Sequence, residues 1–219
     1  MVPKLTNREL VIVDDAEELA RRASSIFIEM APRKAALSGG ETPRRTYEIL
    51  AQSEFRWDAT QLFLTDERYL PLDHASSNYK MVNETLTAKV SAVFHHVDTS
   101  LAPEKASAQY DQIVREKHPF DFVFLGLGAD GHTASIFPGT PASPPGLLAD
   151  AAFSRATGLW RITLTLEALN AAKDVIFIVA GKSKAEALVR MMRDDSIPAA
   201  AVSPKGSITV LADRAAAGS

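Results

Sequence analysis

The sequence contains no cysteine among its 219 residues. Disulfide bonds, thiolate metal ligands and cysteine nucleophiles are therefore excluded. No apolar run approaches the length of a transmembrane helix, and the first ten residues, MVPKLTNREL, lack the apolar segment of a signal peptide. We therefore expect a cytoplasmic protein that has no membrane partner.

An excess of basic residues is also missing. Lys and Arg together number 24 against 27 Asp and Glu, which gives a formal net charge of −3. This balance provides no electrostatic footprint for nucleic acid, although a local group of cations can still hold a phosphate. Because 46% of the residues are hydrophobic and no linker or internal repeat interrupts the chain, we expect one domain over residues 1–219.

Apolar, β-rich segments alternate with helical patterns along most of the chain. This alternation predicts an α/β fold with a mainly parallel sheet and helices on both faces, a Rossmann-like arrangement of three layers. The predicted strands are residues 11–13, 34–38, 61–65, 93–97, 121–125, 161–165, 174–180 and 207–211. The predicted helices are residues 15–30, a helix that begins at Pro43, and residues 77–86, 103–117 and 183–192, and a Pro/Gly/Ser-rich loop is expected at 138–146.

The most informative segment is FDFVFLGLGADGHTAS, residues 120–135. A continuous apolar strand suits a sheet that is buried on both faces, and ligands bind beyond the carboxyl ends of such strands. Glycines such as Gly131 allow the backbone to turn and to approach a ligand closely. Asp130 and His132 follow the strand, where an imidazole can act as a general base and a carboxylate can orient it. We therefore predict an active-site loop.

A second segment, SGGETP at residues 38–43, lies between a predicted strand and a predicted helix. Free N–H groups at a helix start, beside the pair Gly39 and Gly40, favour an anion such as phosphate. The hydroxyl of Ser38 or Thr42 can add a donor. The alternative is an ordinary turn in which Thr42 caps the helix.

Polar residues also follow the strand at 61–65. Arg68 can bind a phosphate or a carbonyl oxygen with two hydrogen bonds, and Asp66 can transfer a proton. Ser77 and Asn78 add hydroxyl and amide groups, although serine is also a common helix cap. The alternative for the triplet 66–68 is a loop of solvated charges.

Two more cations, Arg161 and Lys184, lie near the later strands. Lys184 is early in a predicted helix, where the helix dipole does not favour a cation, so we interpret it as a residue that contacts an anionic ligand. Lys182 competes for this role, and the residues alone do not decide between them. We predict no metal site, because His95 and His96 would point to opposite faces of a strand. Thr133 and Ser135 are candidate nucleophiles, but the GxSxG pattern of serine hydrolases is absent.

Five segments in their order resemble the 6-phosphogluconolactonase family. They are SGGETP (38–43), LTDERYLPLDHASSNY (64–79), FDFVFLGLGADGHTASIFPG (120–139), RITLT (161–165) and GKSKAEAL (181–188). The resemblance implies the α/β fold that glucosamine-6-phosphate deaminases and ribose-5-phosphate isomerases share. It also implies hydrolysis of 6-phospho-D-glucono-1,5-lactone to 6-phosphogluconate in the oxidative pentose phosphate pathway, with a phosphorylated sugar lactone as partner, no redox cofactor and no catalytic metal.

The chain departs from this resemblance before the RITLT strand, where the family commonly has a Lys-Pro-Pro-like segment and this chain has ATGLW at residues 156–160. The reaction suggests that His132 activates water and that Asp130 orients the imidazole of His132. Arg68, Arg161, Lys184 and the loop N–H groups would then hold the phosphate or stabilise the oxyanion.

Two alternatives remain. A glucosamine-6-phosphate deaminase would use Asp66 to move a proton, but such enzymes usually have Asp-Glu-Tyr in place of Asp66-Glu67-Arg68, and Asn-Glu-Pro after the histidine loop. A sugar-phosphate sensor without catalysis is normally fused to a helix-turn-helix, and only about ten residues precede the first predicted strand here. We therefore expect the lactonase.

Overall fold

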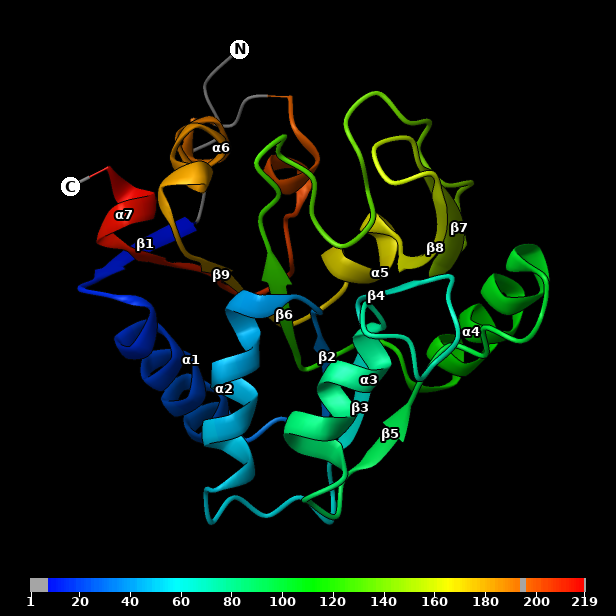
Figure 1. Ribbon diagram of the computed structural model, residues 1–219, viewed down its shortest axis with the longest axis horizontal. Coiled ribbons are helices and arrows are strands. Elements are labelled where there is room, and N and C mark those ends of the chain that lie inside the picture. The colour runs from blue at the N-terminus through cyan, green and yellow to red at the C-terminus, as the bar shows by residue number, and fades with distance from the viewer. Residues whose placement is uncertain (1–7, 194–195, 219) are drawn as a thin grey trace.

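The fold is built around a sheet of parallel strands. The computed structural model describes residues 8–193 and 196–218, and in these ranges seven strands form the sheet in the order β1-β10-β9-β6-β2-β3-β5 (Figure 1). The strands are β1 (Arg8–Val13), β2 (Lys34–Leu37), β3 (Gln61–Leu64), β5 (Val93–His95), β6 (Phe122–Gly126), β9 (Asp174–Val179) and β10 (Ile208–Asp213). Every neighbouring pair is parallel, as the sequence predicted.

Helices cover both faces of this sheet. On one face lie α1 (Ala16–Met30), α2 (Glu41–Ala51) and α3 (Asn78–Val82), which continues as a π-helical turn, Asn83–Thr87. On the other lie α4 (Pro103–Lys117), α5 (Leu166–Asn170), α6 (Ala185–Met192) and α7 (Arg214–Ala217). Two 3₁₀ turns, Lys182–Lys184 and Pro198–Ala201, complete the helical elements of the described residues. The predicted α/β class and its three layers are confirmed.

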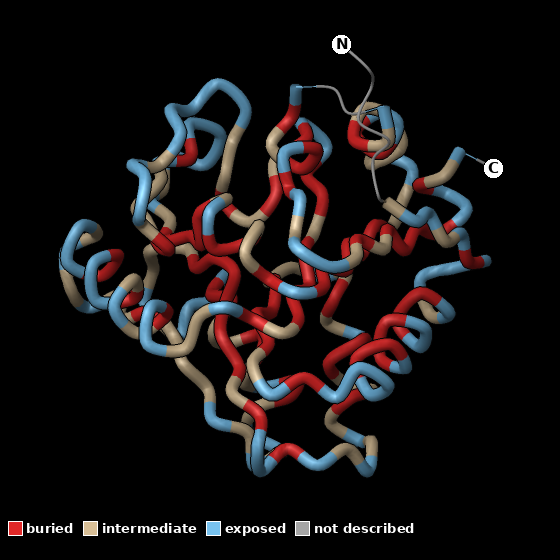
Figure 2. Tube along the Cα trace, turned by 180° about the vertical axis from the view of Figure 1, so that it is seen from behind, coloured by how far each residue is buried: buried red, intermediate tan, exposed pale blue. Residues whose placement is uncertain are grey.

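The central strands explain why the core has two halves. Phe122 and Phe124 of β6 pack into the hydrophobic cluster with α1 and α2, whereas Val123 and Leu125 pack into the cluster with α4 and α6. Successive side chains of a strand point to opposite faces, so a strand covered on both sides must be apolar throughout. All six residues of β9 are buried for the same reason, and Figure 2 shows the buried residues along the central strands.

A second, antiparallel sheet is the main difference from the sequence prediction. It has the order β4-β8-β7, with β4 (Asp66–Arg68), β8 (Leu159–Leu164) and β7 (Ala149–Ser154). The prediction that 66–68 could be a solvated loop is wrong, because these residues pair with β8 and two of them are buried. The segment 161–165 is extended as predicted, but it belongs to this second sheet and not to the parallel one. Pairing between segments so distant in sequence leaves no local pattern.

Several helix boundaries also differ from expectation. Helix α2 begins at Glu41, so Thr42 lies inside the helix and is not its cap; Gly40 is the cap residue. The predicted helix 77–86 becomes α3 and a π-helical turn, and β7, α5 and α7 were not predicted. Residues 138–146 contain neither helix nor strand, as expected. No helix in the described ranges is long and apolar enough to cross a membrane.

Candidate active site

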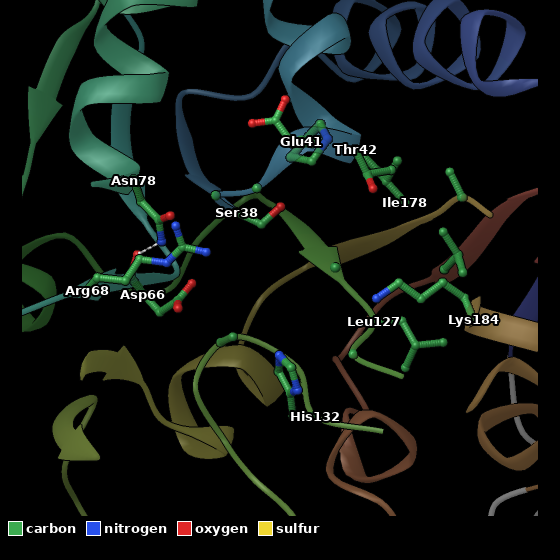
Figure 3. Close-up of a pocket in the computed structure, with 18 of the residues that line it drawn as sticks. Ser38, Glu41, Thr42, Asp66, Arg68, Asn78, Leu127, His132, Ile178 and Lys184 are labelled. Carbon is green, nitrogen blue, oxygen red and sulfur yellow. Dashed lines mark hydrogen bonds between the residues drawn. The ribbon is translucent and has the colours of Figure 1, made fainter. Parts of the chain in front are cut away.

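The carboxyl ends of the central strands open into a cleft with a volume of about 320 Å³. Its walls are the segments that follow β2, β3, β6 and β9 (Figure 3). Arg161 of β8 also lines the cleft. This is the edge at which open α/β sheets bind ligands. The site residues that the sequence predicted and that line the cleft are Gly39, Gly40, Thr42, Asp66, Arg68, Asn78, His132, Arg161 and Lys184.

The turn between β2 and α2 forms one wall of the cleft. Gly40 has φ +101°, which favours glycine, and no side chain caps the N–H groups of the first turn of α2. The hydroxyl of Ser38 is buried and has no hydrogen-bond partner among the described residues. A Cβ at Gly39 would lie 1.9 Å from Oδ1 of Asn78, so a larger residue there requires the Asn78 side chain to move. The uncapped N–H groups and the free hydroxyl suit an anionic oxygen.

His132 and Asp130 form a hydrogen-bonded pair in the loop after β6. Nδ1 of His132 lies 2.6 Å from Oδ1 of Asp130, and the backbone N–H of His132 donates to the same oxygen at 3.1 Å. Burial opposes ionisation of Asp130, but these hydrogen bonds outweigh it and lower the pKa of the carboxyl. Because the ionised carboxylate only accepts hydrogen bonds, Nδ1 of His132 is the donor of this contact and Nε2 is the ring nitrogen that Asp130 does not engage.

The position of this pair depends on a glycine. A Cβ at Gly128 would lie 2.1 Å from Nδ1 of His132 and 2.6 Å from Oδ1 of Asp130. The backbone of Gly128 also donates to the carbonyl of His132 at 2.8 Å. The ring of Phe137 packs against the imidazole with 5.2 Å between the centroids. The loop therefore holds the imidazole in one place beside the cleft.

Two arginines face each other across the second sheet. Arg68 of β4 and Arg161 of β8 are paired residues in the antiparallel register. Like charges in this position destabilise a sheet, and Nε of each side chain is buried without a partner among the described residues. Burial lowers the pKa of the Arg161 guanidinium; Asp66, whose Oδ2 lies 3.9 Å from Nη1, opposes this shift and Arg68 adds to it. Such an arrangement suits a ligand with negative charge.

Asp66 is hydrogen-bonded to the loop that follows β6 and carries His132. Its Oδ2 accepts a 2.6 Å hydrogen bond from the hydroxyl of Ser135, whose N–H donates to Oγ1 of Thr163 at 3.0 Å. Oγ1 of Thr133 donates to the carbonyl of Gly126 at 2.9 Å. Thr133 and Ser135 are buried and neither lines the cleft. The two candidate nucleophiles therefore serve as structural hydrogen-bond donors.

Three predicted site residues do not line the cleft but contact residues that do or that hold its loops. Asp130 contacts His132, as described above. The hydroxyl of Ser77 accepts from the N–H of Lys80 and caps α3, the alternative that the sequence left open. Gly131 has φ +92°, and a Cβ there would meet Ile197 at 2.8 Å. Its role in the structure is thus the close packing of the loop.

The cleft also contains a lysine and an apolar wall. Of the two competing lysines, Lys184 lines the cleft and Lys182 does not. The sequence reasoning missed the apolar wall of Leu127, Ile178 and Val179, although each lies at or beyond the carboxyl end of a predicted strand. It also missed Glu67, which is completely buried. No group of three or more His, Cys, Asp or Glu residues within 8–193 and 196–218 has an arrangement that would hold a metal ion.

Known proteins resemble this chain in sequence and in fold. The sequence model described as Glucosamine-6-phosphate isomerases/6-phosphogluconolactonase matches residues 6–211. The 6-phosphogluconolactonase of Thermotoga maritima is 38% identical, over 84% of this chain and 82% of the relative. That of Synechocystis sp. is 34% identical, over 98% and 96%. A crystal structure of the Thermotoga maritima 6-phosphogluconolactonase superposes with a TM-score of 0.84 and 33% identity, over 94% of this chain and 99% of that one.

Proposed function

The chain belongs to the family of glucosamine-6-phosphate isomerases and 6-phosphogluconolactonases, and on that basis we propose that it hydrolyses 6-phospho-D-glucono-1,5-lactone to 6-phospho-D-gluconate in the oxidative pentose phosphate pathway. Curated relatives with the name 6-phosphogluconolactonase support this assignment. The observation that carries it is the joint presence in one cleft of a His–Asp pair and two facing arginines. The pair suits proton transfer, and the arginines suit a phosphorylated substrate.

In this mechanism His132 is the general base. Its Nε2 takes a proton from a water molecule as the water oxygen attacks C1 of the lactone, and the carbonyl oxygen becomes an oxyanion. When the tetrahedral intermediate collapses, the bond between C1 and the ring oxygen breaks. The protonated imidazole then returns its proton to that oxygen, which becomes a hydroxyl group of the product. Asp130 keeps Nδ1 protonated and stabilises the charged imidazole between the two steps.

The remaining polar residues bind the two anionic groups of the reaction, the phosphate and the oxyanion. Arg68, Arg161 and Lys184 supply positive charge, and the N-terminus of α2 with Thr42 supplies N–H and hydroxyl donors. In Figure 3, Thr42 and Lys184 lie on the opposite side of the cleft from Arg68. Asn78 also lines the cleft, and its amide group suits hydrogen bonding with a sugar hydroxyl. Positive groups on both sides fit a substrate that is charged at one end and develops charge at the other.

The decisive experiment follows hydrolysis of freshly made 6-phosphogluconolactone. Product formation is coupled to 6-phosphogluconate dehydrogenase, and spontaneous opening of the lactone is subtracted. We expect enzyme-dependent turnover, and a loss of about 10²-fold or more in kcat/KM for His132→Ala. Equal turnover in that variant would assign the base elsewhere, with Asp66 the next residue to test. Absence of turnover above the spontaneous rate in the wild type would refute the proposed function.

The alternative within the family is glucosamine-6-phosphate deamination, for which Asp66 would have to exchange protons with the substrate. Its carboxyl group already accepts a hydrogen bond from Ser135 and lies 3.9 Å from Arg161, so the protein itself engages Oδ2 of Asp66. Ammonia release from glucosamine 6-phosphate is the matching assay. Ammonia release that exceeds lactone hydrolysis in kcat/KM would reverse the assignment.

We also infer that the described residues, 8–193 and 196–218, belong to one domain, because both hydrophobic clusters pack on the same sheet. The remaining residues of the expected domain 1–219 lie outside the described ranges. The net charge of −3 supports a small-molecule substrate and no nucleic-acid partner. The cytoplasmic location and the lack of a cofactor that we expect from the sequence stay predictions.

A further inference from the structure

Glu67 is a buried carboxylate that the proposed mechanism does not use. It lies in the middle of β4, between Asp66 and Arg68, which both line the cleft. Because successive side chains of a strand alternate, Glu67 points to the other face of β4 and does not reach the cleft. Its exposed fraction is 0%, lower than that of any other Asp or Glu within the described ranges. A charge in this position costs free energy unless hydrogen bonds satisfy it.

Four donors converge on this carboxylate. Oε1 accepts from the backbone N–H of Arg68 at 2.7 Å and from that of Asn78 at 2.8 Å. Oε2 accepts from the backbone N–H of Tyr79 at 2.6 Å and from the hydroxyl of Ser77 at 3.2 Å. A backbone N–H is always a donor, so the three backbone contacts require acceptors, and the two oxygens of the carboxyl group provide them. Burial raises the pKa of Glu67, and these three backbone hydrogen bonds oppose the rise.

Two of these donors belong to cleft residues. The carboxylate fixes the backbone of Arg68 on β4 and the backbone of Asn78 at the start of α3. Nδ2 of Asn78 in turn donates to the carbonyl of Asp66 at 2.8 Å, and its amide packs on Gly39 of the β2–α2 turn. Through these contacts one buried group connects β4, α3 and the turn at the N-terminus of α2. All three elements carry groups that we assign to ligand binding.

We propose that Glu67 is a positioning residue for the substrate: its carboxyl group holds Arg68 and Asn78 side by side on one wall of the cleft, in the relative positions that bind the phosphorylated sugar. This inference rests on the proposed function. Its physical basis is that a displacement of binding groups by about 1 Å lowers activity by up to about 10²-fold. Glu67 forms no ion pair within residues 8–193 and 196–218, so its contacts with the backbone are the ones that offset its burial.

The test is the substitution Glu67→Gln, which keeps the size of the side chain but places an NH₂ group against one set of donors. We expect KM for 6-phosphogluconolactone to rise about tenfold while kcat changes less than about threefold. A purely structural role gives a different result, because a smaller folded fraction lowers the apparent kcat and leaves KM unchanged. Glu67→Asp keeps the carboxyl group but shortens the side chain by one methylene group, and we expect it to give an intermediate KM. This second variant keeps the test valid if the glutamine variant fails to fold.

The matched control is Asp174→Asn. Asp174 is also a buried carboxylate, and Oδ1 accepts from the N–H and hydroxyl of Ser207 at 3.1 and 2.6 Å, but it begins β9 at the end of the sheet opposite the cleft. We expect its KM to equal that of the wild type. An unchanged KM in both Glu67 variants, or the same rise in Asp174→Asn, would overturn the inference.

A binding measurement separates this inference from the proposed function. Calorimetric titration with 6-phosphogluconate gives Kd without turnover, and we expect Kd to rise about tenfold in Glu67→Gln. If the wild type fails to hydrolyse the lactone but binds 6-phosphogluconate, the proposed function fails and the comparison of Kd values still tests Glu67. If the wild type hydrolyses the lactone and both KM and Kd are unchanged in the variants, only the positioning role fails.

Discussion

Arg68 and Arg161 lie directly opposite each other on the antiparallel strands β4 and β8. Two positive charges in this relationship repel each other, and a protein selected for stability alone would avoid the pair. Asp66 compensates in part from a distance of 3.9 Å to Arg161. We interpret the pair as stability of this sheet given up for the anion binding that we propose, as is common at functional sites.

Replacement of Arg161 tests this exchange of stability for binding. We expect Arg161→Gln to lower kcat/KM about 10²-fold or more, because a donor to a charged group of the substrate is lost. The free energy of unfolding without ligand should stay within about 1 kcal/mol of the wild type, since both the repulsion from Arg68 and the attraction to Asp66 disappear.

Thermal unfolding with and without 6-phosphogluconate measures both effects. The ligand should raise the Tm of the wild type, and the variant should lose most of this increase. Arg155→Gln is the control, because Arg155 is an exposed residue of the turn between β7 and β8. A normal ligand-dependent increase in Arg161→Gln would contradict the role of this residue.

Gly128 provides a test of the imidazole position that leaves His132 and Asp130 in the sequence. The Cβ in Gly128→Ala would lie 2.1 Å from Nδ1 of His132, so the ring has to move. We expect kcat to fall at least about tenfold, because the base leaves its position next to the attacking water. Circular dichroism should show an intact fold. If kcat stays at the wild-type value, the His132–Asp130 geometry is not required for catalysis.

Ser135→Ala distinguishes a nucleophile from a structural donor. Loss of the 2.6 Å hydrogen bond to Asp66 should lower the free energy of unfolding by about 1.5–3 kcal/mol, while kcat/KM retains a measurable fraction of the wild-type value. Chemical denaturation and the coupled assay give the two quantities. Ser24→Ala is a suitable control, since this buried serine donates to the carbonyl of Ala20 in α1 at 2.8 Å. Hydrolysis at the spontaneous rate alone would instead make Ser135 a candidate nucleophile again.

Asp111 of α4 leads to a prediction about pH. Burial opposes its ionisation, but hydrogen bonds from Arg115 and from the N–H groups of Leu148 and Ala149 outweigh burial and lower the pKa of the carboxyl. A folded-state pKa below the unfolded value of about 3.9 gives stability that is present above that value and is lost as the pH falls through the lowered pKa.

We therefore expect Asp111→Asn to destabilise the protein by about 1–3 kcal/mol at pH 7, and the difference from the wild type to shrink as the pH falls below about 4. Urea denaturation at several pH values checks this. The exposed pair of Asp58 with Arg56 supplies the control Asp58→Asn, for which we expect little change. A difference for Asp111→Asn that does not depend on pH would show that its ionisation is not the cause.

The parts of the site that depend on local sequence were predictable. The apolar run of β6 and the glycines after it indicated where His132 and Asp130 lie, and the structure places them together as expected. The glycine pair before α2 likewise indicated a wall of the cleft. In each case the strand, the turn and the chemically active side chain lie within about fifteen residues, so one stretch of sequence contains the whole signal.

The second sheet could not be predicted in the same way. Strand β4 has three residues, all charged, and its partner β8 begins at Leu159. A short charged segment usually indicates a solvated loop, and the pattern does not show that Glu67 is buried beneath the start of α3. The pairing of Arg68 with Arg161, on which the electrostatics of the cleft depend, exists only after the chain has folded.

The contact between Gly39 and Asn78 limits which substitutions this site can accept in evolution. The amide of Asn78 occupies the volume that a side chain at position 39 would need. A lineage that acquires a larger residue at position 39 must therefore also accept a smaller one at position 78, and the intermediate with only the first change would lose the cleft. A change that shortens the side chain at position 78 must therefore come first, which fixes the order in which this corner of the site can diverge.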